Sequence, residues 1–100
     1  MRMAKSKKFD AADYLDTPDV IAAYLSEAFE TGDSKYIAEA LGTVARAKGM
    51  SEVARGTGLS REGLYKSLSS QGSPELFTAM KVLDSLDMQL VVKPKGKEAA

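Results

Sequence analysis

Residues 50–69 read MSEVARGTGLSREGLYKSLS, and this stretch decides the fold. Two short helical patterns flank GTGLS, in which Gly58 can adopt the positive φ that a sharp turn requires. Neither pattern is long enough to form a stable helix alone, since isolated helices below about 12 residues are marginal in water. The stretch therefore predicts two short helices held in place by neighbouring elements.

The spacing of small and apolar residues within this stretch predicts a helix-turn-helix. Ala54 precedes Gly58 by four positions, and Leu64 follows Gly58 by six. The two helices of such a motif cross steeply, so a small residue is needed where they touch. We expect Val53, Leu59, Leu64 and Leu68 to pack inward. Together with Ala54 at the helix crossing and Gly58 in the turn, they form the expected core of the helix-turn-helix.

The outward residues of the second short helix are polar, as in a helix that reads base edges in the major groove. Arg61 suits the O6 and N7 atoms of guanine, although it also fits an ordinary solvated surface position. Glu62 suits a cytosine amino group or orients Arg61, Tyr65 suits a thymine methyl or a phosphate, and Lys66 suits a phosphate or a guanine. Expected phosphate donors, which set register on the DNA, are Ser60, Ser67, Ser69 and Gln71.

Three longer amphipathic patterns surround the motif. One begins at Thr17–Pro18 and ends at Gly32, and the next runs from Asp33 to Lys48 with Gly49 as its stop. Gly42 lies inside this second helix at a cost of about 1 kcal/mol relative to alanine, which a close helix–helix approach would explain. The third pattern runs from Pro74 to Leu86, with apolar residues Leu76, Phe77, Met80, Leu83 and Leu86 at helical spacing.

Residues 88–93 have a different pattern, because Met88, Leu90 and Val92 alternate with Gln89 and Val91. Alternation of this kind predicts a β-strand. A lone strand is unstable, so we expect it to pair with its twin in a two-fold homodimer, burying Leu90 and Val92.

The length of 100 residues corresponds to one domain. We expect a disordered basic arm over 1–8, a single helix-turn-helix domain over 9–93 and a flexible tail over 94–100. The expected fold is all-α, a compact helical bundle of the repressor-like (lambda-repressor-like) helix-turn-helix class with a C-terminal β-strand paired in a dimer.

The composition excludes several kinds of site. The chain has no cysteine and no histidine, which removes disulfides, zinc-finger ligation and Cys- or His-based nucleophilic catalysis. No apolar run reaches the roughly 18 residues of a membrane span, and no signal peptide is evident. We therefore expect a cytoplasmic protein that is not an enzyme and has no cofactor, no metal and no membrane association.

The net charge is zero, but the charge is unevenly distributed. Residues 1–9 carry +4, residues 10–40 carry −7, residues 41–72 carry +3, and residues 73–100 are neutral. Such asymmetry is typical of a protein with two partners of opposite charge, although acids also favour helix N-termini and solvated faces.

The residues also carry a resemblance to a known family. The stretches YLDTPDVIAAYLSEAF, GDSKYIAEALGTVARAKGMSEVARGTGLSREGLYKSLS and SPELFTAMKVLDSLDMQLVVKP together resemble addiction-module antidotes, small Cro/CI-type helix-turn-helix antitoxins. The resemblance covers about residues 9–94. It implies a protein that neutralises a basic RelE-like mRNA-cleaving toxin and represses its own operon by binding double-stranded operator DNA as a dimer.

The resemblance carries Ser60, Arg61, Glu62, Tyr65 and Lys66 over as DNA-facing positions. This sequence departs from the family pattern at Asp87–Met88, where a glycine is expected before the strand. Two other interpretations stay open: a stand-alone Cro/CI-type transcriptional regulator with no toxin partner, and a protein-interaction module in which the motif is only a scaffold.

Overall fold

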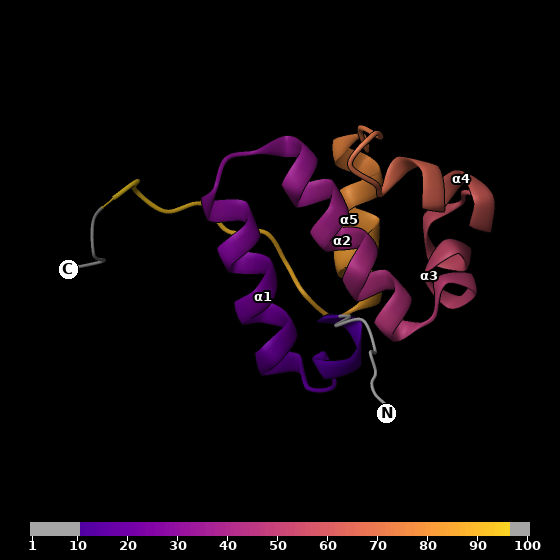
Figure 1. Cartoon of the computed structure of the whole chain (residues 1–100), viewed down its shortest axis with the longest axis horizontal. Helices are drawn as coiled ribbons and strands as arrows, with labels where there is room; N and C mark the ends of the chain where they lie inside the picture. The colour runs from indigo at the N-terminus through magenta and orange to yellow at the C-terminus, as the bar shows by residue number, and fades with distance from the viewer. Residues whose placement is uncertain (1–10, 97–100) are drawn as a thin grey trace, which may run out of the picture.

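The computed structural model describes residues 11–96, and every regular element within this range is helical (Figure 1). The all-α expectation is therefore confirmed for the described residues. The expected basic arm, residues 1–8, lies outside them, as do residues 97–100 of the expected tail. The elements are η1 (Ala11–Tyr14), α1 (Pro18–Glu30), α2 (Ser34–Lys48), α3 (Met50–Thr57), α4 (Arg61–Ser67) and α5 (Leu76–Ser85).

Short-range hydrogen bonds fix the ends of the helices. The Thr17 hydroxyl accepts from the Val20 amide at 3.3 Å, and Asp33 Oδ1 accepts from the Lys35 amide at 3.0 Å. Gly49, with φ of 122°, ends α2 and begins α3. The Thr17 and Asp33 caps satisfy amides that the first helical turn leaves without intrahelical partners, whereas Gly49 has no side chain to do so.

The central element is α2, which packs against η1, α1, α3 and α5. In Figure 1, α1 lies on one side of α2, α3 and α4 lie on the other, and α5 passes behind. Leu41 and Val44 of α2 are fully buried, together with Val53, Leu64 and Val82 from three other helices. One apolar cluster thus joins all five α-helices.

Gly42 explains how closely α2 approaches the end of α4. A Cβ atom at this position would overlap the backbone carbonyl oxygen of Leu68, the residue that caps α4. The close approach predicted at Gly42 is therefore present, and its partner is backbone rather than a side chain.

The expected apolar face of the last helix is only partly covered. The helix begins at Leu76, slightly later than predicted, and its second half buries Val82 and Leu83. Its first half leaves Leu76, Phe77 and Met80 at 68%, 62% and 51% exposure.

The prediction of a β-strand over 88–93 is wrong for the single chain. After α5 the amide of Asp87 donates to the Asp84 carbonyl at 3.0 Å, and that of Met88 donates to the Leu83 carbonyl at 2.8 Å. Asp87 takes a left-handed φ of 60° in this turn, so it occupies the conformation for which a glycine is expected. Beyond it, the chain runs past α1 without regular structure, because the described residues contain no strand that could pair with it.

Candidate nucleic-acid interface

A tight turn sets the angle between α3 and α4. Gly58 adopts a left-handed φ of 80°, and its amide donates to the Ala54 carbonyl at 3.2 Å. The buried Thr57 hydroxyl donates to the same carbonyl at 2.9 Å and accepts from the Leu59 amide at 3.2 Å. The Gly58 and Leu59 amides thus have local partners, which favours one orientation of the two short helices.

Apolar side chains anchor this α3–α4 unit to the rest of the bundle. Val53 and Leu64 are completely buried, and Ala54 and Leu68 are nearly so. The expectation that Leu59 also packs inward is wrong, since it is 38% exposed. The left-handed turn at Gly58 redirects the chain, and Thr57, at 6% exposure, supplies the buried side chain instead.

The outer surface of α4 presents polar side chains to solvent. Ser60 caps the helix by accepting from the Gly63 amide at 2.9 Å, which leaves its hydroxyl hydrogen available to another acceptor. The Arg61 guanidinium lies over the Tyr65 ring, 5.3 Å from its centroid. This contact between residues one helical turn apart holds the arginine along the exposed face of α4. Also exposed on this helix are Glu62 and Lys66.

The remaining candidate phosphate donors differ in availability. Gln71 is exposed, whereas Ser67 and Ser69 are half-buried. The Ser69 hydroxyl donates to the Lys66 carbonyl at 3.0 Å, so in this conformation it has no hydrogen left for a phosphate. Sequence spacing placed Ser69 near the surface of the motif but could not show that the end of α4 uses its hydroxyl.

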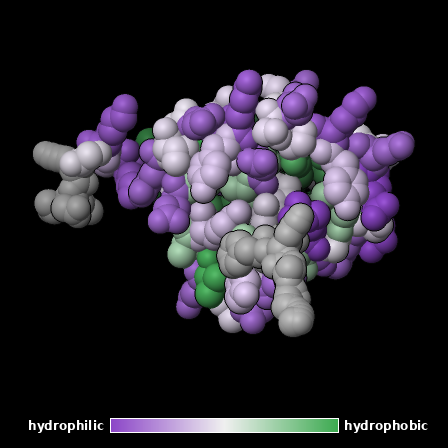
Figure 2. Space-filling model, viewed as in Figure 1, coloured by the Kyte–Doolittle hydropathy of each residue, from purple (hydrophilic) through white to green (hydrophobic). Residues whose placement is uncertain are grey.

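One basic residue near this surface was missed as a candidate. Arg55 is exposed in the last turn of α3, and among the described residues no carboxylate pairs with Arg55, Arg61 or Lys66. Arg55 contributes to the positive charge of residues 41–72, but the helix-turn-helix pattern singles out only the second short helix as the reading element. In Figure 2 the surface over α3 and α4, at the right, is predominantly hydrophilic.

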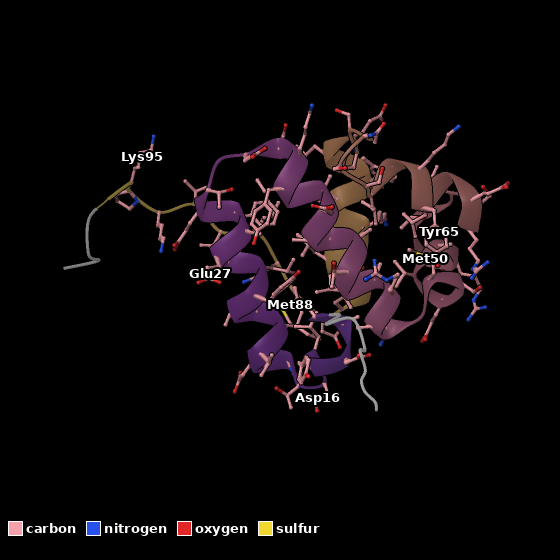
Figure 3. All side chains as sticks on the ribbon, in the orientation of Figure 1. Asp16, Glu27, Met50, Tyr65, Met88 and Lys95 are labelled. Carbon is pink, nitrogen blue, oxygen red and sulfur yellow. The ribbon has the colours of Figure 1, made fainter. Side chains whose placement is uncertain are left out.

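The opposite side of the molecule is acidic. The described residues 11–34 contain six carboxylates and neither lysine nor arginine. In Figure 3, Glu27 on α1 and Tyr65 on α4 lie on opposite sides of the bundle. Lys93 Nζ pairs with Glu30 Oε2 at 3.2 Å, but both side chains are well exposed. The six carboxylates, all on exposed residues, are Asp13, Asp16, Asp19, Glu27, Glu30 and Asp33.

Two other kinds of feature do not occur in residues 11–96. No group of three or more Asp or Glu side chains is close enough together there to hold a metal ion. No helix in that range has both the length and the apolar character to cross a membrane.

Comparisons with known proteins identify relatives over nearly the whole chain. Residues 5–94 match the model of a family described as "Probable addiction module antidote protein". An uncharacterized protein of Haemophilus influenzae is 45% identical over 87 residues, which cover 87% of this chain and 90% of that protein. No solved structure matches the chain.

Proposed function

This chain belongs to the family of probable addiction module antidote proteins, and from that premise we propose that it neutralises a toxin and represses its own operon by binding DNA. Membership of the family supports an antitoxin role, and hence a toxin partner in general. The DNA-binding part of the proposal is carried by one observation. A set of exposed polar and basic side chains lies on a short helix that follows the Gly58 turn, and among the described residues no carboxylate pairs with its basic members.

In the proposed complex, α3 and α4 form a repressor-like helix-turn-helix, and α4 enters the major groove of operator DNA. Arg61 reads a guanine through its two parallel donors, and Tyr65 keeps the guanidinium extended along the helix before binding. Glu62 accepts from a cytosine amino group or orients Arg61. The phosphate contacts come from Lys66, Ser60, Gln71 and Arg55, with Ser67 near the edge of the surface.

Operator recognition is proposed to involve a homodimer, because a two-fold protein presents two reading helices to two half-sites about 34 Å apart. The segment after α5 supplies pairing groups in this proposal. Leu90 and Val92 are 42% and 95% exposed, while Met88 packs against the core. Among the described residues, no backbone group from Gln89 to Lys95 bonds to another backbone group, so this segment offers an open edge.

The toxin is proposed to be a basic, RelE-like ribonuclease that docks on the acidic surface formed by η1 and α1. That surface carries carboxylates without compensating basic residues on the same elements, and it faces away from α4. Complementary charge of this kind accelerates association and falls in effect as salt rises. Both partners could then bind one antitoxin at the same time.

The DNA-binding proposal is tested by a mobility shift on the DNA upstream of the gene. We expect Arg61→Ala to weaken operator binding by about 1–3 kcal/mol and to relax the preference at one base pair. Lys35→Ala is the matched control, because Lys35 is an exposed basic residue in the first turn of α2, outside the α3–α4 unit. Equal losses for the two variants would indicate only general charge attraction and would refute base reading by Arg61.

The toxin proposal is tested with the product of the neighbouring reading frame. If that product is a short basic chain, the double variant Asp19→Lys and Glu27→Lys should slow its association with this protein at least tenfold at low salt. The same variant should keep its affinity for operator DNA. A neighbouring frame that encodes no such chain would favour the stand-alone regulator, whereas toxin binding without any operator binding would favour the protein-interaction module.

A further inference from the structure

Backbone from two other parts of the chain encloses the C-terminal end of α4. A Cβ atom at Gly72, in the loop between α4 and α5, would overlap the carbonyl oxygens of Lys66 and Ser67. A Cβ at Gly42 of α2 would overlap the next carbonyl oxygen along the chain, that of Leu68. These carbonyl groups are therefore packed against two positions that only glycine can occupy, and we call this packing the two-glycine contact.

Hydrogen bonds hold the loop that carries Gly72 against the same end of α4. The Gly72 amide donates to the Ser69 carbonyl at 2.9 Å, and the Ser69 hydroxyl donates to the Lys66 carbonyl at 3.0 Å. Ser69 Oγ also accepts from the Gln71 amide at 3.3 Å. Because the last carbonyls of an α-helix have no partners within the helix, a loop that supplies one stabilises the helix end.

Packing, rather than backbone conformation, requires glycine at these two positions. Neither Gly42 nor Gly72 has a positive φ, unlike Gly58. A Cβ on Gly63, within α4 itself, would meet only the side-chain oxygen of Ser60, at 3.2 Å. A Cβ on Gly42 or Gly72 would instead meet backbone atoms, which cannot move away by a change of rotamer. Replacing either glycine must therefore displace the end of α4 or the segment that faces it.

We propose that Gly42 and Gly72 are positioning residues for the DNA-reading side chains of α4. The inference rests on the proposed operator binding and deepens it, because it assigns residues that govern base discrimination without touching DNA. The Gly58 turn and the Ser60 cap lie at the N-terminal end of α4, and the two-glycine contact lies at its C-terminal end. Contacts at both ends set the tilt of the helix, and a reading side chain must be held to within about 0.5 Å of its productive position.

The last turn of α4 connects the two-glycine contact to Arg61. Tyr65 precedes Lys66 in that turn, and the Arg61 guanidinium lies over the Tyr65 ring, 5.3 Å from its centroid. A shift of the last turn therefore moves the ring that supports the guanidinium. Reading guanine requires two parallel hydrogen bonds from Arg61, whereas Lys66 can meet a phosphate as a point charge. Displacing this turn should consequently cost base discrimination more than general affinity for DNA.

The first test compares two DNA duplexes in mobility shifts. One is the DNA upstream of the gene, and the other is the same DNA changed at the base pair whose preference Arg61→Ala relaxes. We expect Gly72→Ala and Gly42→Ala each to lower the ratio of the two affinities about fivefold or more, because a misplaced Arg61 loses the base while phosphate contacts act on both duplexes. In the Arg61→Ala background, both changes should leave this ratio nearly unaltered, as expected for residues that act through one side chain.

Ala28→Gly is the matched control for loss of stability. It also changes one methyl group at a buried helical position, but Ala28 belongs to α1, which lies across α2 from α4 (Figure 1). This variant should leave the ratio of the two affinities unchanged. Circular dichroism melts select a temperature at which the variants are folded, and Gly42→Ala carries the test if Gly72→Ala does not fold.

Amide hydrogen exchange of the full chain, without DNA, tests the positioning of α4 directly. The Leu68 amide donates to the Leu64 carbonyl at 2.9 Å at the end of α4, and the Val53 amide donates to the Gly49 carbonyl at 3.0 Å in α3. We expect both glycine variants to accelerate exchange at Leu68 about tenfold more than at Val53, because the end of α4 opens locally. Ala28→Gly should accelerate exchange at the two amides alike.

Three results would overturn the inference. The first is equal acceleration at the Leu68 and Val53 amides in the glycine variants. The second is equal weakening on the two duplexes, which lost phosphate contacts or general instability would explain. The third is a change in the affinity ratio that persists in full without Arg61. If the unaltered chain does not bind the upstream DNA, the proposed function fails, and exchange at Leu68 still decides whether the two glycines hold α4 in place.

Discussion

Gly42 and Gly56 are both helical glycines, yet the structure predicts opposite effects of replacing them with alanine. A Cβ at Gly42 would lie well inside the 3.0 Å that real Cβ atoms essentially never approach, and the atom it would meet is the backbone carbonyl oxygen of Leu68. A Cβ at Gly56 would meet only Ser85 Cβ, at 3.8 Å, which is an ordinary contact.

The magnitudes follow from two opposing terms. Alanine gains about 1 kcal/mol over glycine in a helix interior, whereas forcing a methyl group into a packed site costs about 1–3 kcal/mol. Because the obstructing atom at Gly42 is backbone, α2 and the end of α4 must separate, and we expect the upper part of that range. Gly42→Ala should therefore lose about 1–2 kcal/mol of unfolding free energy, while Gly56→Ala should gain about 0.4–1 kcal/mol.

Thermal unfolding followed by circular dichroism measures both changes at equal protein concentration. A change of 1 kcal/mol shifts the Tm of a domain of this size by about 4–8 °C, so the two variants should differ clearly. Gly42→Ala should also weaken operator binding under the proposed function, because α4 carries the reading residues. If Gly42→Ala raised the Tm as much as Gly56→Ala, the close approach of α2 to Leu68 would be incorrect.

Three further predictions concern stability. Ser60→Ala should lower the unfolding free energy by about 1 kcal/mol in urea titrations, because the Gly63 amide loses its acceptor, and Ser73→Ala, where no cap bond exists, should have little effect. Asp87→Gly should preserve or raise the Tm while Asp87→Val lowers it, since only the latter suffers at a φ of 60°; equal Tm values would argue against the left-handed turn. Lys93→Ala should change stability by less than about 0.5 kcal/mol in the same titrations, because the Lys93–Glu30 pair is exposed, and a larger loss would show that the segment is held more firmly than one ion pair implies.

The sequence by itself determined the features that depend on near neighbours in the chain. The starts of α1, α2 and α4 follow from Thr17, Asp33 and Ser60, whose side chains accept from amides within three residues. The turn between α3 and α4 follows from Gly58 in the same way. Because these interactions close over three or four residues, the types of residue and their spacing suffice to predict them.

Only the tertiary structure decided which of the apolar and polar groups have partners. Leu59 and Met80 have the same apolar character as buried leucines, but the turn at Gly58 leaves Leu59 exposed, and Met80 lies on a different face of α5 from the buried Thr78 and Val82. Ser69 is not available as a phosphate donor, because its hydroxyl donates to the Lys66 carbonyl. The alternating residues after Met88 form no strand, because strand formation depends on a partner far away in the sequence or in a second chain, which local pattern cannot supply.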